Sequence, residues 1–293
     1  MAHEVATLVL PAYSNKFSRQ DFTLPQLFAC LVLREHQKKS YRGVEALLRD
    51  APHWCKDIGM RGVPDHNTLC RAFHLLISHR RMNQMLDLLA HWFRTAKALG
   101  AVGAMDSTLY DTHHRSRHYE QRCRHHSSRK SSTANARRSR SAKRTPKLGI
   151  SADVRSHVIL SAHARTGMGS DCRDFEPLLR DACRRNNMHT VLADAGYDSD
   201  ANHRLAREKL GVRSLIKAGA GRPSPRPLKS AYRRRMQRQL QGSQAGRLYG
   251  QRAQVETVNS MMKRNLGDSL SARTSVARRH QQLLRVVTHN VML

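Results

Sequence analysis

Two hydrophobic periodicities divide the chain near residue 100. Between residues 20 and 97, apolar side chains recur at intervals of three and four, which is the helical period. From residue 101 onward, short apolar runs alternate with helical patterns, and this alternation is typical of an α/β sheet covered by helices. The pattern therefore predicts a small all-helical N-terminal domain over residues 1–98 and an α/β domain over residues 99–293.

The N-terminal pattern predicts short helices separated by a glycine-containing turn. "SYRGVEALLRD" opens on Ser40 as a helix cap, and "PDHNTLCRAF" places polar capping residues after Pro64. With Gly59 and Gly62 in the turn between them, this order fits a helix-turn-helix-like DNA-binding domain. A plain helical bundle without a DNA role fits the same pattern, so both interpretations stay open.

Five short apolar runs predict the strands of the sheet. Two of them flank a turn near Arg155 and Ser156, and "VRSLIKAG" supplies the fifth. The other two, "AVGAM" and "TVLA", each end directly in an acid, Asp106 and Asp194. Ligands collect at strand ends in α/β sheets. A turn or a helix cap explains either acid alone, but the pair favours a shared pocket.

The stretch "YGQRAQVETVNSMMK" predicts one continuous amphipathic helix over residues 249–263. At about 100° per residue, Tyr249, Arg252, Glu256 and Lys263 fall within about 60° of one another. This polar stripe either presents Glu256 beside the sheet or is exposed surface with ion pairs between helical neighbours. The side that would pack on the sheet is apolar and carries Val255, Val258, Met262 and Leu266.

The charge of the chain indicates its partner. Lys and Arg number 52 against 22 Asp and Glu, which gives a formal net charge of +30. Such an excess repels itself unless a polyanion is near, and nucleic acid is the polyanion that fits best. A basic membrane-surface protein is the competing class, but we find neither an apolar run near 18 residues nor the charged opening of a signal peptide. We expect a cytoplasmic, nucleoid-associated protein.

The segment 113–147 is rich in Arg, Lys, Ser and His, and it holds no acid from Gln121 onward. It cannot bury a core, so we expect it to be flexible. A solvated linker is the simple interpretation, whereas the charge favours a DNA-gripping arm. Its histidines and Cys123 lack the ordered ligand spacing of a zinc finger. The arm's expected DNA contacts are Arg137, Arg138, Arg140, Lys143 and Arg144.

Three carboxylates stand out as a possible metal site. Asp106, Asp194 and Glu256 would supply the hard oxygen ligands that Mg²⁺ prefers. Two such ions about 3.5–4 Å apart activate an attacking oxygen and stabilise a leaving one in phosphoryl transfer. We therefore select these three acids as catalytic and metal-binding residues. Asp198 is instead expected to cap the helix that begins near Asp200.

The same residues carry a family resemblance. Tyr249, Arg252, Glu256 and Lys263 fit Y-x2-R-x3-E-x6-K without a gap. This resembles the signature helix of the DDE transposases of bacterial insertion sequences, of the family-four and family-five type. "MDST" and "LADAGYDS" resemble the family's first and second Asp segments, and "SYRGVEALLRD" with "GVPDHNTLCRAF" resembles its helical leader. The resemblance runs from about residue 20 to the end of the chain.

The resemblance implies an RNase H-like fold, a mixed five-stranded sheet flanked by helices, with Mg²⁺ or Mn²⁺ as the cofactor. It implies DNA strand cleavage and strand transfer at terminal inverted repeats and target DNA, by a homodimer on paired ends. Carried over by position, Asp106, Asp194 and Glu256 would bind the metal. Arg252 would orient Glu256 or a phosphate, and Tyr249 would contact DNA near the scissile bond, as would Lys263.

Two other classes share the high positive charge. One is a non-catalytic DNA- or RNA-binding protein, for instance an inactive transposase derivative that acts as a repressor. The other is a structural RNA-associated protein. Neither class needs acids after two strands and on a packed helix, so Asp106, Asp194 and Glu256 count against both.

Overall fold

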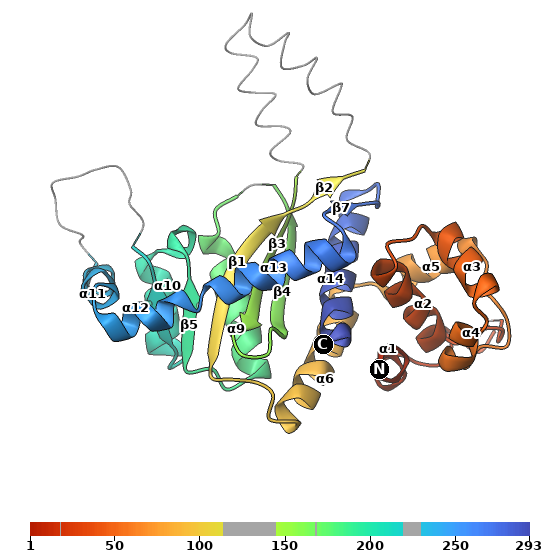
Figure 1. Ribbon diagram of the computed structural model, residues 1–293, viewed down its shortest axis with the longest axis horizontal. Coiled ribbons are helices and arrows are strands. Elements are labelled where there is room, and N and C mark those ends of the chain that lie inside the picture. Colours follow the sequence, from red (N-terminus) through yellow and green to blue (C-terminus); the bar gives the residue numbers. More distant parts are fainter. Residues whose placement is uncertain (18, 114–144, 168, 219–229) are drawn as a thin grey trace, which may run out of the picture.

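A computed structural model describes five stretches of the chain, with α-helices at the N-terminus and a helix-covered sheet after them (Figure 1). The described residues are 1–17, 19–113, 145–167, 169–218 and 230–293. Among them, no helix has both the length and the apolar content needed to cross a membrane.

Helices dominate the first 95 residues, as the helical periodicity predicts. Thr23, Ser40, Asp65 and Ser78 each cap a helix by accepting a hydrogen bond from a backbone amide of its first turn. Gly59 follows α4 in a left-handed conformation, with a φ of 72°, which a side chain would disfavour. The helices are α1 (Ala2–Val9), α2 (Leu24–His36), α3 (Tyr41–Asp50), α4 (His53–Ile58), α5 (His66–Leu76) and α6 (His79–Thr95).

Five strands form one mixed sheet in the order β4-β3-β1-β5-β6. The central strand β1 pairs antiparallel with β3 and parallel with β5, and β6 continues the parallel side. The predicted α/β class with a mixed five-stranded sheet is therefore confirmed. The strands are β1 (Val102–Leu109), β3 (Pro146–Asp153), β4 (Ile159–Thr166), β5 (Thr190–Ala193) and β6 (Arg213–Ile216).

Helices cover both faces of this sheet. Because successive side chains of a strand point to opposite faces, Ala104 and Met105 of β1 belong to different core clusters. The cluster with Ala104 includes the apolar side of α13 (Ala253–Leu266) and of α14 (Ser275–Met292). The cluster with Met105 includes α9 (Cys172–Arg185). The alternation places Asp106 on the α13 face, where α13 crosses β1 (Figure 1).

Shorter elements complete the described chain. A two-stranded ladder joins β2 (Asp111–Thr112) to β7 (Ser269–Leu270). Between β5 and α13 lie η1 (Ala195–Tyr197), α10 (Asp200–Arg204), η2 (Leu205–Lys209), α11 (Ala231–Leu240) and α12 (Ser243–Gly250). Gly211 lies just after η2 with a φ of 66°, in the left-handed region that favours glycine.

The continuous helix predicted over residues 249–263 is wrong. Helix α12 ends at Gly250 and α13 begins at Ala253, so Tyr249 and Glu256 lie on different helices. The turn between them is tight, because the Arg252 amide bonds the carbonyl three residues back, at 2.9 Å, and glycine weakens the helix at this point. The predicted apolar side is buried as expected, at Val255, Val258, Met262 and Leu266.

The N-terminal helices join the sheet layer through α14. Glu35, at the end of α2, is 3% exposed and contacts two arginines, Arg34 at 2.5 Å and Arg285 of α14 at 2.8 Å. The Arg285 guanidinium also donates to the backbone oxygens of Gly267 and Ser269, at 2.8 and 2.9 Å. One buried cation therefore holds α2, α14 and the chain that follows α13 together.

Candidate active site

Asp106 and Asp194 come from neighbouring parallel strands. Met105 pairs with Ala193 in the β1–β5 ladder, so each of the two acids is the next residue along the chain. Strand β5 ends at Ala193, and Asp194 follows directly, as predicted. The expectation that Asp106 ends its strand is wrong, because antiparallel pairing with β3 extends β1 to Leu109. Asp106 is therefore held within the strand rather than at its end.

Asp106 is partly buried beneath α13. Its Oδ2 accepts a hydrogen bond from the Asn259 side-chain amide of α13, at 2.9 Å. Burial raises the pKa of Asp106 above its ordinary value, and the nearby negative charge of Asp194 raises it further. The backbone amide of Ser107 and the Asn259 amide oppose this shift without cancelling it. The site thus holds two like charges close enough to disturb one another.

Asp194 is fixed by the turn that follows it. Its Oδ1 accepts a hydrogen bond from the Gly196 backbone amide, at 2.9 Å, and so caps η1. A Cβ at position 196 would come within 3.0 Å of that oxygen and 3.1 Å of Asp171 Oδ2. Glycine at this position therefore allows the Asp194 turn to pass close to a third carboxylate.

That third carboxylate, Asp171, was not selected from the sequence. It precedes α9, and its Oδ1 accepts from the Ser107 hydroxyl at 2.7 Å and pairs with the Lys147 ammonium. Ser107 follows Asp106 on β1 and points to the opposite face of the sheet. Asp171 therefore neighbours Asp194 but is already neutralised by a lysine, which sets it apart from Asp106.

Glu256 lies in the first turn of α13 and is paired with Arg252. The Arg252 guanidinium donates to Glu256 Oε1 at 2.5 Å, and the Glu256 side chain is 54% exposed. Arg252 is also close enough to Asp106 to favour its charged form. The guanidinium therefore lies near both acids, as the predicted role of orienting Glu256 requires.

Tyr249 and Lys263 lie on either side of this pair along the chain. The Tyr249 hydroxyl donates to the backbone oxygen of Ala193 at 3.3 Å, which brings α12 against the residue before Asp194. The Lys263 ammonium lies 5.8 Å from the ring centroid of buried Tyr110, at the end of β1. Both residues therefore flank the acids, although they come from two helices.

A cleft of about 1040 Å³ opens beside these residues. Asp106, Glu256 and Asn259 line it from β1 and α13, whereas Asp194 does not. Its other side is formed by the N-terminal helices and by the chain after α13. The cleft also has a basic lining, which comprises Arg34, Lys38, Lys39, Lys263, Arg264 and Arg285. A negatively charged strand in this cleft would therefore have cations as well as Asp106 beside it.

The donor atoms of Asp106, Asp194 and Glu256 do not form a compact cluster of metal ligands. Within the described residues, the cluster whose donor atoms all lie within 4.8 Å of one another is Glu45, Asp65 and His66, in the N-terminal helices. His66 Nδ1 contacts the two carboxylates at 2.8 and 3.0 Å, and this contact lowers the pKa of Glu45. Hydrogen bonds between His66 of α5 and Glu45 of α3, together with the role of Asp65 as the cap of α5, account for that cluster.

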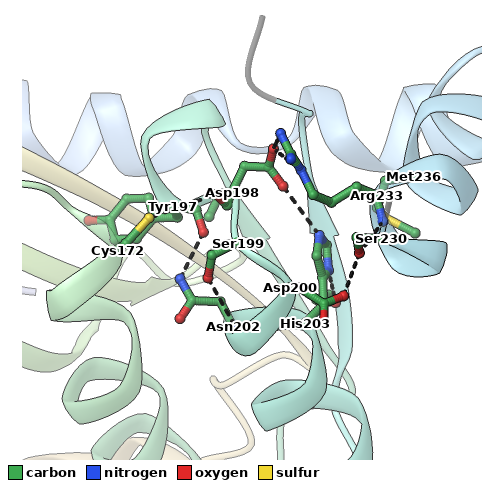
Figure 2. A network of polar contacts seen from close by, with 12 residues as sticks. Cys172, Tyr197, Asp198, Ser199, Asp200, Asn202, His203, Ser230, Arg233 and Met236 are labelled. Carbon is green, nitrogen blue, oxygen red and sulfur yellow. Dashed lines mark hydrogen bonds and ion pairs between the residues drawn. The ribbon is translucent and has the colours of Figure 1, made fainter. Parts of the chain in front are cut away.

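A buried polar network holds the loop after Asp194 against α11. Figure 2 shows Asp198 between Arg233 and His203, at 2.7 and 3.7 Å. The prediction that Asp198 caps the next helix is wrong, because the Ser199 hydroxyl accepts from the Asn202 amide and takes that role. Asp198 instead forms a buried ion pair that fixes the segment following the candidate site.

A comparison with known protein families identifies the family of this chain. A family model described as the transposase DDE domain matches residues 97–291. The chain belongs to the DDE transposase family. No curated protein and no solved structure matches it significantly.

The DDE transposase family comprises DNA transposition enzymes that use divalent metal ions. The matched stretch begins just before β1 and includes all three predicted acids. It ends within α14, which packs on both the sheet and α2.

The DNA contacts predicted for the arm lie outside the described residues. They are Arg137, Arg138, Arg140, Lys143 and Arg144.

The sequence analysis missed Asn259, although it lies three residues after Glu256 and on the side of α13 that faces β1. A polar residue within an otherwise apolar helix face was the available signal.

Proposed function

We propose that this DDE transposase catalyses metal-dependent DNA strand cleavage and strand transfer at the ends of an insertion sequence. The observation that carries the proposal is the juxtaposition of Asp106 and Asp194 on paired strands beside a basic cleft. The sheet order and strand directions support an RNase H-like catalytic fold for residues 99–293. Residues 1–98 then supply a helix-turn-helix-like DNA-binding domain.

The carboxylates fit a divalent cation by charge and by donor type. Asp106 receives a hydrogen bond from a neutral amide, and its pKa is raised by burial and further by the charge of Asp194. A cation held by the two carboxylates would offset this repulsion, and carboxylate oxygens are the ligands that Mg²⁺ and Mn²⁺ prefer. Asp106, Asp194 and Glu256 would hold the ion. When bound, it supplies charge stabilisation to the phosphoryl group that is transferred.

Arg252 couples DNA binding to the availability of Glu256. In the free protein its guanidinium is bonded to the Glu256 carboxylate. A guanidinium also matches the geometry of a phosphate, so a DNA strand in the cleft competes for it. Once Arg252 holds a phosphate, Glu256 is free to turn toward Asp106. Tyr249 and Lys263 contact the same strand near the scissile bond.

The reaction proceeds in two displacements at phosphorus. Water attacks the phosphodiester at the end of the element, and the departing oxygen becomes a 3′-hydroxyl. That hydroxyl then attacks a phosphodiester of target DNA, and a second 3′ oxygen leaves. A homodimer brings two terminal inverted repeats together, and the basic segment 113–147 grips the DNA. The protein works on the nucleoid in the cytoplasm.

The test is strand nicking of a labelled duplex that carries the repeats flanking the gene. Wild-type protein is compared with Asp106→Asn, Asp194→Asn and Glu256→Gln, in Mg²⁺ and in Mn²⁺. We expect nicking to be lost in all three variants while DNA binding, measured by mobility shift, persists. Glu176→Gln is the control, because Glu176 is an exposed acid of α9 that pairs with Arg180 on the helix surface.

The outcomes separate the proposal from its alternative. Nicking that survives in any of the three variants would remove that acid from the site. Binding of the repeats by wild-type protein without nicking in either metal would instead identify a non-catalytic DNA-binding protein or an inactive transposase derivative.

A further inference from the structure

Asn259 connects the signature helix to the first acid. It lies on α13, three residues after Glu256, and is 6% exposed. Its Nδ2 donates to Asp106 Oδ2 at 2.9 Å, across 153 residues of sequence. The neighbours of Asn259 on this side of α13 are apolar, with Val255, Val258 and Met262 all buried. A single amide is therefore set into the hydrophobic side that packs on the sheet.

The oxygen of this amide lacks a hydrogen-bond partner within the part of the chain that the structure describes. Among the described residues, Asn259 Oδ1 is buried and accepts no hydrogen bond. A buried polar atom left in this way costs about 1–3 kcal/mol, so such an atom calls for an explanation. Turning the amide over would not help, because Oδ1 would then face the Asp106 carboxylate and Nδ2 would lose its acceptor.

The position of Asn259 indicates which ligand its Oδ1 could contact. Asn259 lines the same cleft as Asp106 and Glu256, so all three approach one space from β1 and from α13. An amide oxygen is a hard donor of the kind that divalent cations take in proteins alongside carboxylates. Carboxylates that hold a metal are themselves held by hydrogen bonds, and those partners influence metal affinity.

We propose that Asn259 is a further residue of the cation site: Nδ2 positions Asp106, while Oδ1 serves the cation, directly or through a bound water. This inference rests on the metal-dependent function proposed above. It assigns the unpartnered oxygen to the ion, whereas a residue that only ties α13 to β1 would need no acceptor there. It also explains why an amide interrupts a side of α13 that is otherwise built from Val and Met.

The test measures Mn²⁺ affinity of the full-length protein without DNA, from the electron paramagnetic resonance signal of free Mn²⁺. Asn259→Leu keeps similar volume and removes both polar atoms. We expect its dissociation constant for Mn²⁺ to rise about 10–100-fold, the range found when hydrogen-bonding partners of metal ligands are removed. Val258→Ala is the matched control, since Val258 is fully buried on the same helix and has an apolar side chain. This control loses packing and keeps wild-type affinity.

A second variant distinguishes an ion contact from a purely structural amide. Asn259→Asp keeps an oxygen at the Oδ1 position but replaces the Nδ2 donor with a second anionic oxygen beside Asp106. A cation would offset the repulsion between these two carboxylates, so we expect this variant to bind Mn²⁺ at least as tightly as wild type. Weaker binding by Asn259→Asp, or unchanged binding by a folded Asn259→Leu, would overturn the inference. If Asn259→Leu fails to fold by circular dichroism, the aspartate variant decides alone.

Asp106→Asn separates this inference from the proposed function. If Asp106→Asn loses Mn²⁺ binding and Asn259→Leu does not, the carboxylate site stands and the role of Asn259 falls. If wild-type protein binds no Mn²⁺ at all, the metal-dependent function itself fails, and the Asn259 assignment fails with it.

Discussion

Glu35 and Asp106 line the same cleft, yet their surroundings are opposite. Glu35 is buried between Arg34 and Arg285 and also accepts from Gln281 at 3.2 Å. Asp106 receives one neutral amide at 2.9 Å and has the negative charge of Asp194 beside it. One carboxylate is therefore neutralised within the protein, whereas the pKa of the other stays raised despite the nearby Arg252 guanidinium.

The difference shows how to tell a structural acid from a functional one when both are buried. An acid whose cations are supplied by the chain contributes to the fold, and removing it leaves those cations stranded. An acid placed near a like charge lowers the stability of the free protein, and such an arrangement is characteristic of a ligand site. Four experiments test this distinction.

Removing Glu35 should have the most severe consequence, and it should fall on stability. Glu35→Ala leaves the buried Arg285 and Arg34 without their carboxylate, and breaking a buried pair costs about 3–5 kcal/mol. The free energy of unfolding is measured by urea denaturation, with Glu176→Ala as an exposed control. A loss no larger than that of the control would mean that Glu35 is not a structural acid.

Asp106→Asn is expected to act in the opposite way. Cleavage of repeat DNA falls by about 10³-fold or more, because loss of a ligand removes several kcal/mol of transition-state stabilisation. Stability in the absence of metal stays level or rises, since repulsion from Asp194 is relieved. Marked destabilisation of this variant would place Asp106 in the same class as Glu35.

The pH dependence of stability tests whether Asp106 differs from a neutralised acid such as Glu35. The folded pKa of Asp106 is raised, chiefly by burial, so between its unfolded and folded pKa values the folded state binds the extra proton. Stability therefore falls as pH rises through that interval. In EDTA, wild-type protein should lose unfolding free energy relative to Asp106→Asn from acid toward neutral pH. Parallel curves would contradict the raised pKa.

The mildest change concerns Lys39, an exposed cation among the residues that line the cleft. If it contacts one DNA phosphate, Lys39→Ala lowers the slope of log affinity against log salt by about 0.9, with little effect on stability. Binding isotherms over a salt series measure this slope. An unchanged slope would exclude Lys39 from the DNA path.

The local pattern was sufficient for the strands of the sheet, for most of the helices and for the acid that follows β5. Apolar runs reveal strands because burial on both faces leaves a continuous hydrophobic signal, and this located β5 and Asp194. The buried side of α13 was likewise visible from its period of 3.6. The family resemblance added a residue-by-residue assignment that hydrophobicity alone could not supply.

What escaped prediction depends on contacts between distant parts of the chain. Strand β1 continues past Asp106 because β3 pairs with it across the segment that lies outside the described residues. Asp198 is an ion-pair partner of Arg233, 35 residues later, and nothing near Asp198 in sequence indicates this. The bond from Asn259 to Asp106 requires knowing that α13 crosses β1. Neither propensity nor spacing contains that information.

The Arg285 guanidinium has a practical consequence for anyone who purifies this protein. The stretch that defines the family starts at residue 97, whereas the acid that neutralises Arg285 belongs to α2. A fragment cut at that boundary would carry a stranded cation and the α14 surface that α2 normally covers. We expect such a fragment to aggregate, so assays of the chemistry belong with the full-length chain.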